Sequence, residues 1–173
     1  MDMENSLKAY LVGKLKSAGL VHREYASSGE FRSGIYVDIK AAYGHPDIFG
    51  DICDSLWESI EGQPNCIAAA GYGGLPPSSV LAERYDLKFS MVRQSPKSHA
   101  DRGLFDGYAP KEGDNVVIID DVVFTGESLS KVADTVKLTG AGISGCHVVF
   151  KRGSGTLLLP VKYLFSEQDF LDG

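Results

Sequence analysis

The chain is organised around one segment, Val116-Val117-Ile118-Ile119-Asp120-Asp121-Val122-Val123-Phe124-Thr125-Gly126-Glu127-Ser128. Its first four residues are β-branched, which is typical of a parallel strand that is covered on both faces. Leu129, Val132 and Val136 then recur at helical spacing, and this pattern stops at Gly140. The segment therefore predicts a buried strand, a polar turn and a helix, in that order.

The polar turn lies where parallel sheets bind ligands. Backbone N–H groups at the start of the following helix face outward there, and together with the hydroxyl groups of Thr125 and Ser128 they suit a phosphate. A carboxylate beside a phosphate is repulsive unless it serves neutral hydroxyl groups or a cation. Asp120 and Asp121 are therefore suited to a sugar diol or Mg²⁺. The alternative is an ordinary buried strand with a solvated acidic pair at its end.

The length of 173 residues fits a single domain, 1–173, with a substantial core. Within it we expect an N-terminal cap over 1–45, a core over about 46–155 and a C-terminal tail over 156–173. A hydrophobic content of 43% and a charged content of 23% are typical of a soluble globular protein. The net charge of −6 argues against nucleic acid as a partner, because binding a phosphate backbone depends on a broad basic surface.

The cysteines and the N-terminus indicate the compartment. Cys53, Cys66 and Cys146 are scattered and form no Cys-x-x-Cys pair, which favours free thiols in a reducing compartment. The first residues include Asp2 and Glu4 and no long apolar run, so neither a signal peptide nor a membrane span is expected. We therefore expect a cytoplasmic protein with no membrane partner.

Short apolar runs alternate with helical patterns along the chain. They predict strands near 65–70, 87–92 and 145–150, an edge strand at 162–165 and a last helical turn at 166–171. Strands that alternate with helices predict an α/β fold with a doubly wound parallel sheet. Nearer the N-terminus, 35–40 alternates as a half-exposed strand does, and a hairpin arm with a solvated polar face is the plainer interpretation.

Two further segments have the composition of functional loops. Gly71-Tyr72-Gly73-Gly74 predicts a turn that lets the backbone approach a ligand before a helix at 78–85. The segment 93–103 is polar and carries Arg93, Lys97 and His99, charges with no obvious partner nearby in the sequence. Loops of that length are usually functional or mobile. A plain turn and a solvated loop are the alternatives.

Taken together, these motifs resemble those of type I phosphoribosyltransferases, and more narrowly of orotate phosphoribosyltransferases, over about 27–152. The central segment is similar to the signature of that family for phosphoribosyl pyrophosphate (PRPP). Ser28-Gly29 followed by Tyr36-x-Asp38-x-Lys40 is similar to the N-terminal substrate segment of the family. The glycine segment resembles the pyrophosphate loop, and Arg93-x-x-x-Lys97-x-His99 resembles the mobile catalytic loop. The chain departs from the family pattern at Gln94, Ala100, Phe124 and Glu127, and it has Lys151 where the family commonly has Asp before the arginine at 152.

The resemblance implies an α/β phosphoribosyltransferase fold with a small N-terminal cap, and it implies a role for particular residues. Asp120 and Asp121 would contact the ribose hydroxyls, the turn would hold the 5′-phosphate, and Arg152 would contact the carboxylate of orotate. Mg²⁺ would be held mainly by pyrophosphate and the ribose hydroxyls, with no dedicated protein ligands. The implied catalytic residues are Lys97, His99, Asp120 and Asp121; the implied PRPP-binding residues are Arg93, Gln94, Tyr72, Gly73, Asp120, Asp121, Val122, Val123, Phe124, Thr125, Gly126, Glu127 and Ser128; and the implied orotate-binding residues are Thr125, Arg152, Ser28 and Tyr36.

The activity implied by the resemblance is transfer of the ribose 5-phosphate group of PRPP to orotate, giving orotidine 5′-monophosphate and pyrophosphate. It also implies a homodimer in which each subunit lends its catalytic loop to the other site. Two alternatives remain: a phosphoribosyltransferase for another base, and a PRPP-sensing regulator without catalysis. Lys97 and His99 favour an enzyme, since a regulator has no use for them.

Overall fold

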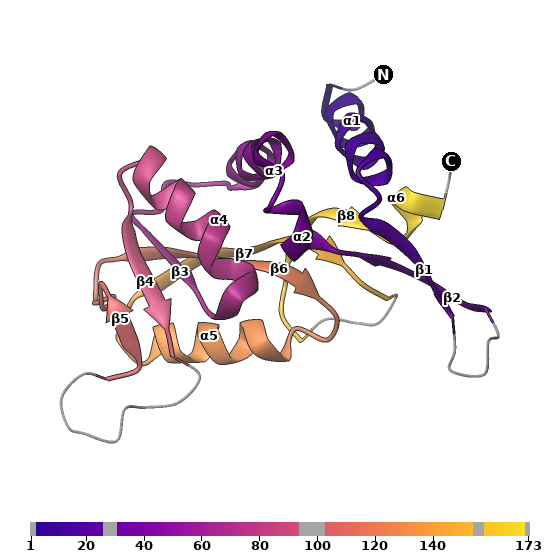
Figure 1. Cartoon of the computed structure of the whole chain (residues 1–173). Helices are drawn as coiled ribbons and strands as arrows, with labels where there is room; N and C mark the ends of the chain where they lie inside the picture. The colour runs from indigo at the N-terminus through magenta and orange to yellow at the C-terminus, as the bar shows by residue number, and fades with distance from the viewer. Residues whose placement is uncertain (1–2, 26–30, 94–102, 154–157, 172–173) are drawn as a thin grey trace.

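The computed structural model describes residues 3–25, 31–93, 103–153 and 158–171 (Figure 1). Its main body is a six-stranded sheet in the order β5-β4-β3-β6-β7-β8. All neighbouring strands are parallel except β4 and β5, which are antiparallel. The strands are β3 (Cys66–Ala69), β4 (Lys88–Val92), β5 (Phe105–Gly107), β6 (Asn115–Val123), β7 (Gly142–Lys151) and β8 (Lys162–Ser166).

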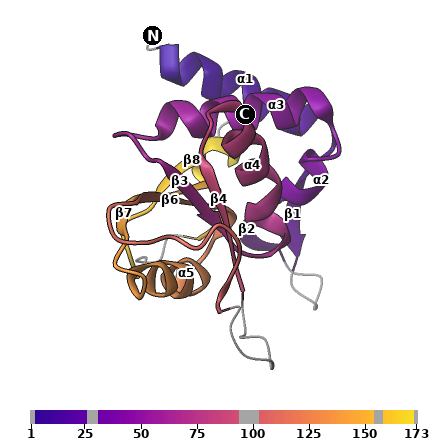
Figure 2. The same ribbon diagram turned by 90° about the vertical axis from the view of Figure 1, so that its left-hand side faces the viewer.

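Helices cover both faces of this sheet, as Figures 1 and 2 show. Val117 and Ile119 of β6 pack into one apolar cluster with α1 (Met3–Ser17), α3 (Pro46–Ser59) and α4 (Gly71–Arg84). Val116 and Ile118 pack into a second cluster with α5 (Glu127–Lys137). These four side chains of β6 are all buried, because successive side chains of a strand point to opposite faces and both faces are covered. The predicted doubly wound sheet is confirmed.

The N-terminal part adds a separate two-stranded antiparallel sheet of β1 (Val21–Tyr25) and β2 (Phe31–Val37). The prediction of a strand over 35–40 is wrong at its end, since α2 (Ile39–Ala42) begins at Ile39. Asp38 ends the strand because its carboxylate accepts a hydrogen bond from the backbone N–H of Ala41 at 3.0 Å, as a helix cap does. Ile39 is buried, so its apolar character belongs to the helix that follows.

The prediction of a turn at Gly71-Tyr72-Gly73-Gly74 is also wrong, because α4 begins at Gly71 and these four residues form the start of that helix. A Cβ atom on Gly73 would overlap the carboxylate of Asp121, and one on Gly74 would overlap the carbonyl oxygen of Ile119. These glycines therefore let the helix pack directly against the end of β6. Close packing of helix on strand, rather than an unusual turn, accounts for them.

The predicted strands and the last helix, α6 (Gln168–Leu171), are otherwise confirmed within a few residues. Strand β5 was missed because three residues are too few to show an alternating pattern. In the part of the chain that the structure describes, none of the helices is both long enough and apolar enough to cross a membrane.

Candidate functional site

The two acids lie at the carboxyl end of the central strand. Asp120 is half-buried, and Asp121 is almost fully buried. The backbone N–H of Asp121 donates to Asp120 Oδ1 at 2.9 Å, which fixes the first carboxylate over its neighbour's backbone. The pair thus lies at the sheet edge that ligands use in open α/β folds.

Asp121 is enclosed by two other elements. Gly73 of α4 lies directly against its carboxylate, and Lys40 of α2 places Nζ 2.5 Å from Asp121 Oδ2. Beside this pair, the hydroxyl of Tyr43 donates to the carbonyl oxygen of Gly73 at 3.0 Å. The N-terminal segment is therefore joined to the acid site through Lys40 and Tyr43.

The acids and the groups around them have shifted pKa values. Burial, together with the nearby charge of Asp121, raises the pKa of Asp120 to about 7, so this carboxyl holds its proton far more readily than a free one. The hydrogen bond to Asp121 raises the pKa of Lys40, although burial opposes that effect. Burial, reinforced by the charges of Asp121 and Asp120, raises the pKa of Tyr43, which therefore remains a hydrogen-bond donor.

The turn after β6 has the form of an anion site. Gly126 adopts a left-handed conformation with φ 84° and precedes the first residue of α5. Thr125 and Ser128 are exposed, and the hydroxyl of Thr125 accepts a hydrogen bond from the backbone N–H of Glu127 at 3.4 Å. The carboxylate of Glu127 pairs with Lys131, at 3.1 Å and on the same helix. The first N–H groups of a helix have no partner within it, so this start can accept a phosphate.

The end of β7 completes this edge. The backbone N–H of Arg152 donates to the carbonyl oxygen of Val123 at 2.9 Å, which sets Arg152 beside the turn. Phe124 is exposed, and a Cβ atom on Gly153 would lie 2.9 Å from its ring. Val123 is buried and the neighbouring Val122 is half-buried, so both contribute mainly to packing.

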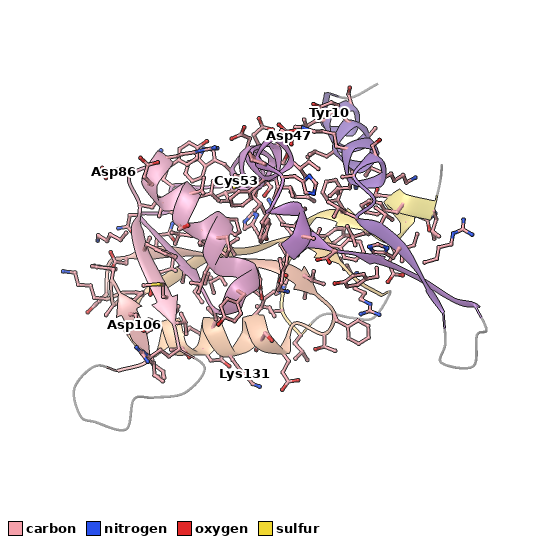
Figure 3. The ribbon with its side chains drawn as sticks, in the orientation of Figure 1. Tyr10, Asp47, Cys53, Asp86, Asp106 and Lys131 are labelled. Carbon is pink, nitrogen blue, oxygen red and sulfur yellow. The ribbon has the colours of Figure 1, made fainter. Side chains whose placement is uncertain are left out.

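Three expected site residues lie on other elements: Tyr72 on α4, Tyr36 on β2 and Arg93 after β4. Tyr72 is exposed on the first turn of α4, and Tyr36 is exposed on β2, where its ring stacks on His22 with centroids 6.1 Å apart. Arg93 follows β4 and pairs through its guanidinium with Asp106 on β5, which Figure 3 labels. The expectation that the charges of 93–103 lack a partner nearby is therefore wrong for Arg93. Antiparallel pairing of β4 and β5 brings Asp106 alongside it.

The structure does not test every expected site residue. Ser28, Gln94, Lys97 and His99 lie outside the described residues. Conversely, Lys40 belongs to the site but was not among the expected site residues. Its partner is 81 residues away in the sequence. The resemblance of Tyr36-x-Asp38-x-Lys40 to the N-terminal substrate segment of the family placed Lys40 near the site but gave it no role.

Comparison with known proteins agrees with this geometry. Residues 42–170 match the family described as the phosphoribosyl transferase domain. The orotate phosphoribosyltransferase of Staphylococcus aureus (strain COL) is 33% identical over 132 residues, which are 75% of this chain and 64% of that protein. This chain thus spans less than two thirds of that relative. The orotate phosphoribosyltransferase of Methanocaldococcus jannaschii is 28% identical over 149 residues, which are 86% of this chain and 84% of that protein.

A solved structure gives the same result for the fold. The crystal structure of orotate phosphoribosyltransferase from Aeropyrum pernix superposes with a TM-score of 0.76 at 27% identity, covering 94% of this chain and 96% of that one. The resemblance predicted from the central segment is confirmed at the level of the family. This chain belongs to the phosphoribosyl transferase domain family.

Proposed function

We propose that this chain transfers the ribose 5-phosphate group of PRPP to orotate, giving orotidine 5′-monophosphate and pyrophosphate. The observation that carries the proposal is the acid pair, Asp120 and Asp121, near the end of a strand that leads through a short turn to a helix start that suits a phosphate. A phosphorylated sugar presents these two chemistries together, since its hydroxyl groups suit carboxylates and its phosphate suits backbone N–H groups. The family and the names of the relatives support the same activity.

Each group would meet a different part of the reaction. The turn at Thr125 and Ser128 would bind the 5′-phosphate, and the acid pair would hold the ribose hydroxyls and lend negative potential to the carbon that becomes oxocarbenium-like. Arg152 would pair with the carboxylate of orotate. By resemblance, Lys97 and His99 would neutralise the departing pyrophosphate.

Mg²⁺ belongs to the proposal as a companion of the substrate. Among the described residues, no group of three or more His, Cys, Asp or Glu side chains is arranged to hold a metal ion. The donor set at the site is the acid pair, and Lys40 already occupies one oxygen of Asp121. Such a site fits an ion held mainly by the oxygens of pyrophosphate and ribose, which is how Mg²⁺ commonly binds with phosphates. When bound, the ion would neutralise negative charge on the leaving group.

The proposal extends to assembly and location. We propose a homodimer in which the segment 93–103 of one subunit serves the site of the other, as the resemblance implies. A lid that carries Lys97 and His99 would then be held by the ligand's charge rather than by core contacts. We also propose the cytoplasm as the location. Cys53, Cys66 and Cys146 are buried free thiols, which is typical of proteins in reducing compartments.

The test is pyrophosphate release from PRPP and Mg²⁺ with a panel of pyrimidine and purine bases. We expect release with orotate and its loss in the variant that combines Asp120→Asn with Asp121→Asn. Pyrophosphate release with a different base only would identify that base, and not orotate, as the substrate. Binding of PRPP without release for any base would support the regulator instead.

A further inference from the structure

Lys40 is held in a fixed place by its neighbours. It lies on the short helix α2, whose start is capped by Asp38 and whose residues Ile39 and Ala42 are buried. The backbone N–H of Asp38 also donates to the carbonyl oxygen of Leu20 at 2.9 Å, which anchors the entry to the helix. The side chain of Lys40 therefore starts from a rigid base.

The ion pair that Lys40 forms is asymmetric. The side chain of Asp121 is 8% exposed, whereas that of Lys40 is 59% exposed, and the two charged atoms are 2.5 Å apart. Gly73 also lies directly against this carboxylate. Asp121 is thus enclosed, while the ammonium group lies at the rim, where it has further N–H donors for solvent or ligand.

The charge balance of the site depends on this pair. Asp120 and Asp121 together present up to two negative charges beside a turn that suits a phosphate, and a phosphorylated sugar brings more. An enclosed carboxylate without a partner is costly, and it repels an anion strongly because little water screens it. Two other cations near this edge are engaged elsewhere: Arg93 pairs with Asp106, and the ammonium of Lys151 lies over the ring of Tyr163 at 5.5 Å.

We propose that Lys40 is a positioning residue for the phosphorylated ligand: it holds Asp121 in place and neutralises it, so that a sugar phosphate can settle against the acid pair. This inference rests on the proposed function, since it assumes PRPP as the ligand. The raised pKa of Lys40 agrees with it, because the side chain then stays charged throughout the ordinary pH range. The contact also links ligand binding to the placement of the N-terminal segment that carries Tyr36.

The experiment measures the affinity of the full chain for PRPP in the presence of Mg²⁺, together with the melting temperature and the separate KM and kcat values. Lys40→Met should weaken PRPP binding on the order of tenfold or more, from the loss of a close charge pair. The KM for PRPP should rise more than the KM for the base. Lys40→Arg should restore most of the affinity, because a guanidinium can also hold the carboxylate.

A second substitution separates charge from scaffolding. Lys40→Gln keeps a hydrogen-bond donor for Asp121 without the positive charge, so PRPP affinity should stay about as weak as in Lys40→Met. A role that only pins the N-terminal segment predicts that Lys40→Gln restores the affinity. Lys14→Met is the matched control, because Lys14 forms a comparable ion pair, 2.6 Å from Asp51, between α1 and α3 and away from the acids. It should lower the melting temperature without changing PRPP affinity.

The possible outcomes distinguish a failure of the inference about Lys40 from a failure of the proposed function. PRPP affinity of Lys40→Met equal to that of the wild type would overturn the inference and leave the proposed function standing. So would recovery of PRPP affinity in Lys40→Gln, which would show scaffolding alone. A wild-type chain that binds no PRPP would overturn the proposed function, and this inference with it.

Discussion

The hydroxyl of Tyr43 donates to the carbonyl oxygen of Gly73 at 3.0 Å, and this bond replaces one that α4 cannot make for itself. In an α-helix, the carbonyl of Gly73 would accept from the N–H of the residue four positions later, which is Pro77. Proline has no N–H, so the carbonyl needs another donor. Tyr43, which immediately follows α2, supplies it and thereby fixes the N-terminal segment against the glycine start of α4.

Replacing Tyr43 by Phe should therefore destabilise the fold. The expected loss is about 1 kcal/mol, the usual cost of leaving a buried carbonyl without its hydrogen bond, which corresponds to about 2–4 °C in melting temperature for a domain of this size. Thermal unfolding measures it. In a Pro77→Ala background the residue at 77 regains an N–H, so Tyr43→Phe should cost less there. An equal loss in both backgrounds would show that the proline is irrelevant to the bond.

Gly73→Ala should disrupt the acid site directly. A Cβ atom there would overlap the carboxylate of Asp121, so this side chain must move and loosen its pair with Lys40. We expect PRPP affinity to fall on the order of tenfold, since small displacements of binding groups have large effects. Gly50→Ala on α3 is the control, because nothing lies within 4 Å of the added atom. That variant should keep its affinity and gain up to about 1 kcal/mol of stability.

Much of the fold followed from patterns that act locally. Strand β6 was predictable because four β-branched residues buried on both faces leave few other interpretations, and α5 because its apolar residues recur on one side. The start of α4 was not, since glycine and proline disfavour helices when considered alone. Packing against Asp121 and Ile119 outweighs that propensity, and such packing is visible only in three dimensions.

The site residues likewise divide into those that are contiguous in the sequence, which could be predicted, and those brought together only by the fold, which could not. The acid pair and the turn after it are contiguous, so their chemistry could be predicted from one segment. The contact between Lys40 and Asp121 joins residues 81 positions apart, and the pairing of Arg93 with Asp106 depends on a strand of three residues. Neither leaves a periodic signal in the sequence. Sequence therefore predicted which residues carry the negative charge better than which residues balance it.

Asp120 should make the stability of the fold depend on pH. Its pKa is raised from 3.8 to about 7, so between these values the folded chain holds a proton that the unfolded chain has released. Its contribution to stability is therefore greatest below about pH 4 and is lost as pH rises toward 7. Asp120→Asn removes this loss. Relative to that of the wild type, the free energy of unfolding of the variant should increase by at least about 1 kcal/mol between pH 5 and pH 8. The variant should also bind PRPP less well.

Melting temperatures at the two pH values measure that gain. Asp134→Asn is a suitable control, because Asp134 is an exposed acid on α5 that pairs with Lys137 at 3.5 Å, away from the site. Its difference from the wild type should stay nearly constant between the two pH values. A constant difference for Asp120→Asn as well would mean that the carboxyl is not protonated in the folded chain near neutral pH.

Arg152→Ala should weaken binding of the base and leave PRPP binding almost unchanged. The reason is that Arg152 follows β7 beside Val123 and would meet the carboxylate of orotate, where a charged hydrogen bond is worth about 1.5–3 kcal/mol. A loss of about tenfold or more in orotate affinity is expected. Lys151→Ala removes the preceding cation, which lies over Tyr163, and should leave orotate affinity intact. Unchanged orotate affinity in Arg152→Ala would remove the main support for this substrate.

The proposed exchange of loops between subunits predicts that two inactive variants repair each other. Lys97→Ala damages the lid and Asp120→Asn damages the floor of the site, so a hybrid dimer has one site with both parts intact and one with neither. Equal random mixing makes half of the dimers hybrid, and activity should return to about a quarter of the wild type if the sites are independent. Mixing Lys97→Ala with His99→Ala is the control, because every lid in that mixture is damaged and no activity should return. If subunits exchange and the first mixture still shows no recovery, the lid serves the site of its own subunit.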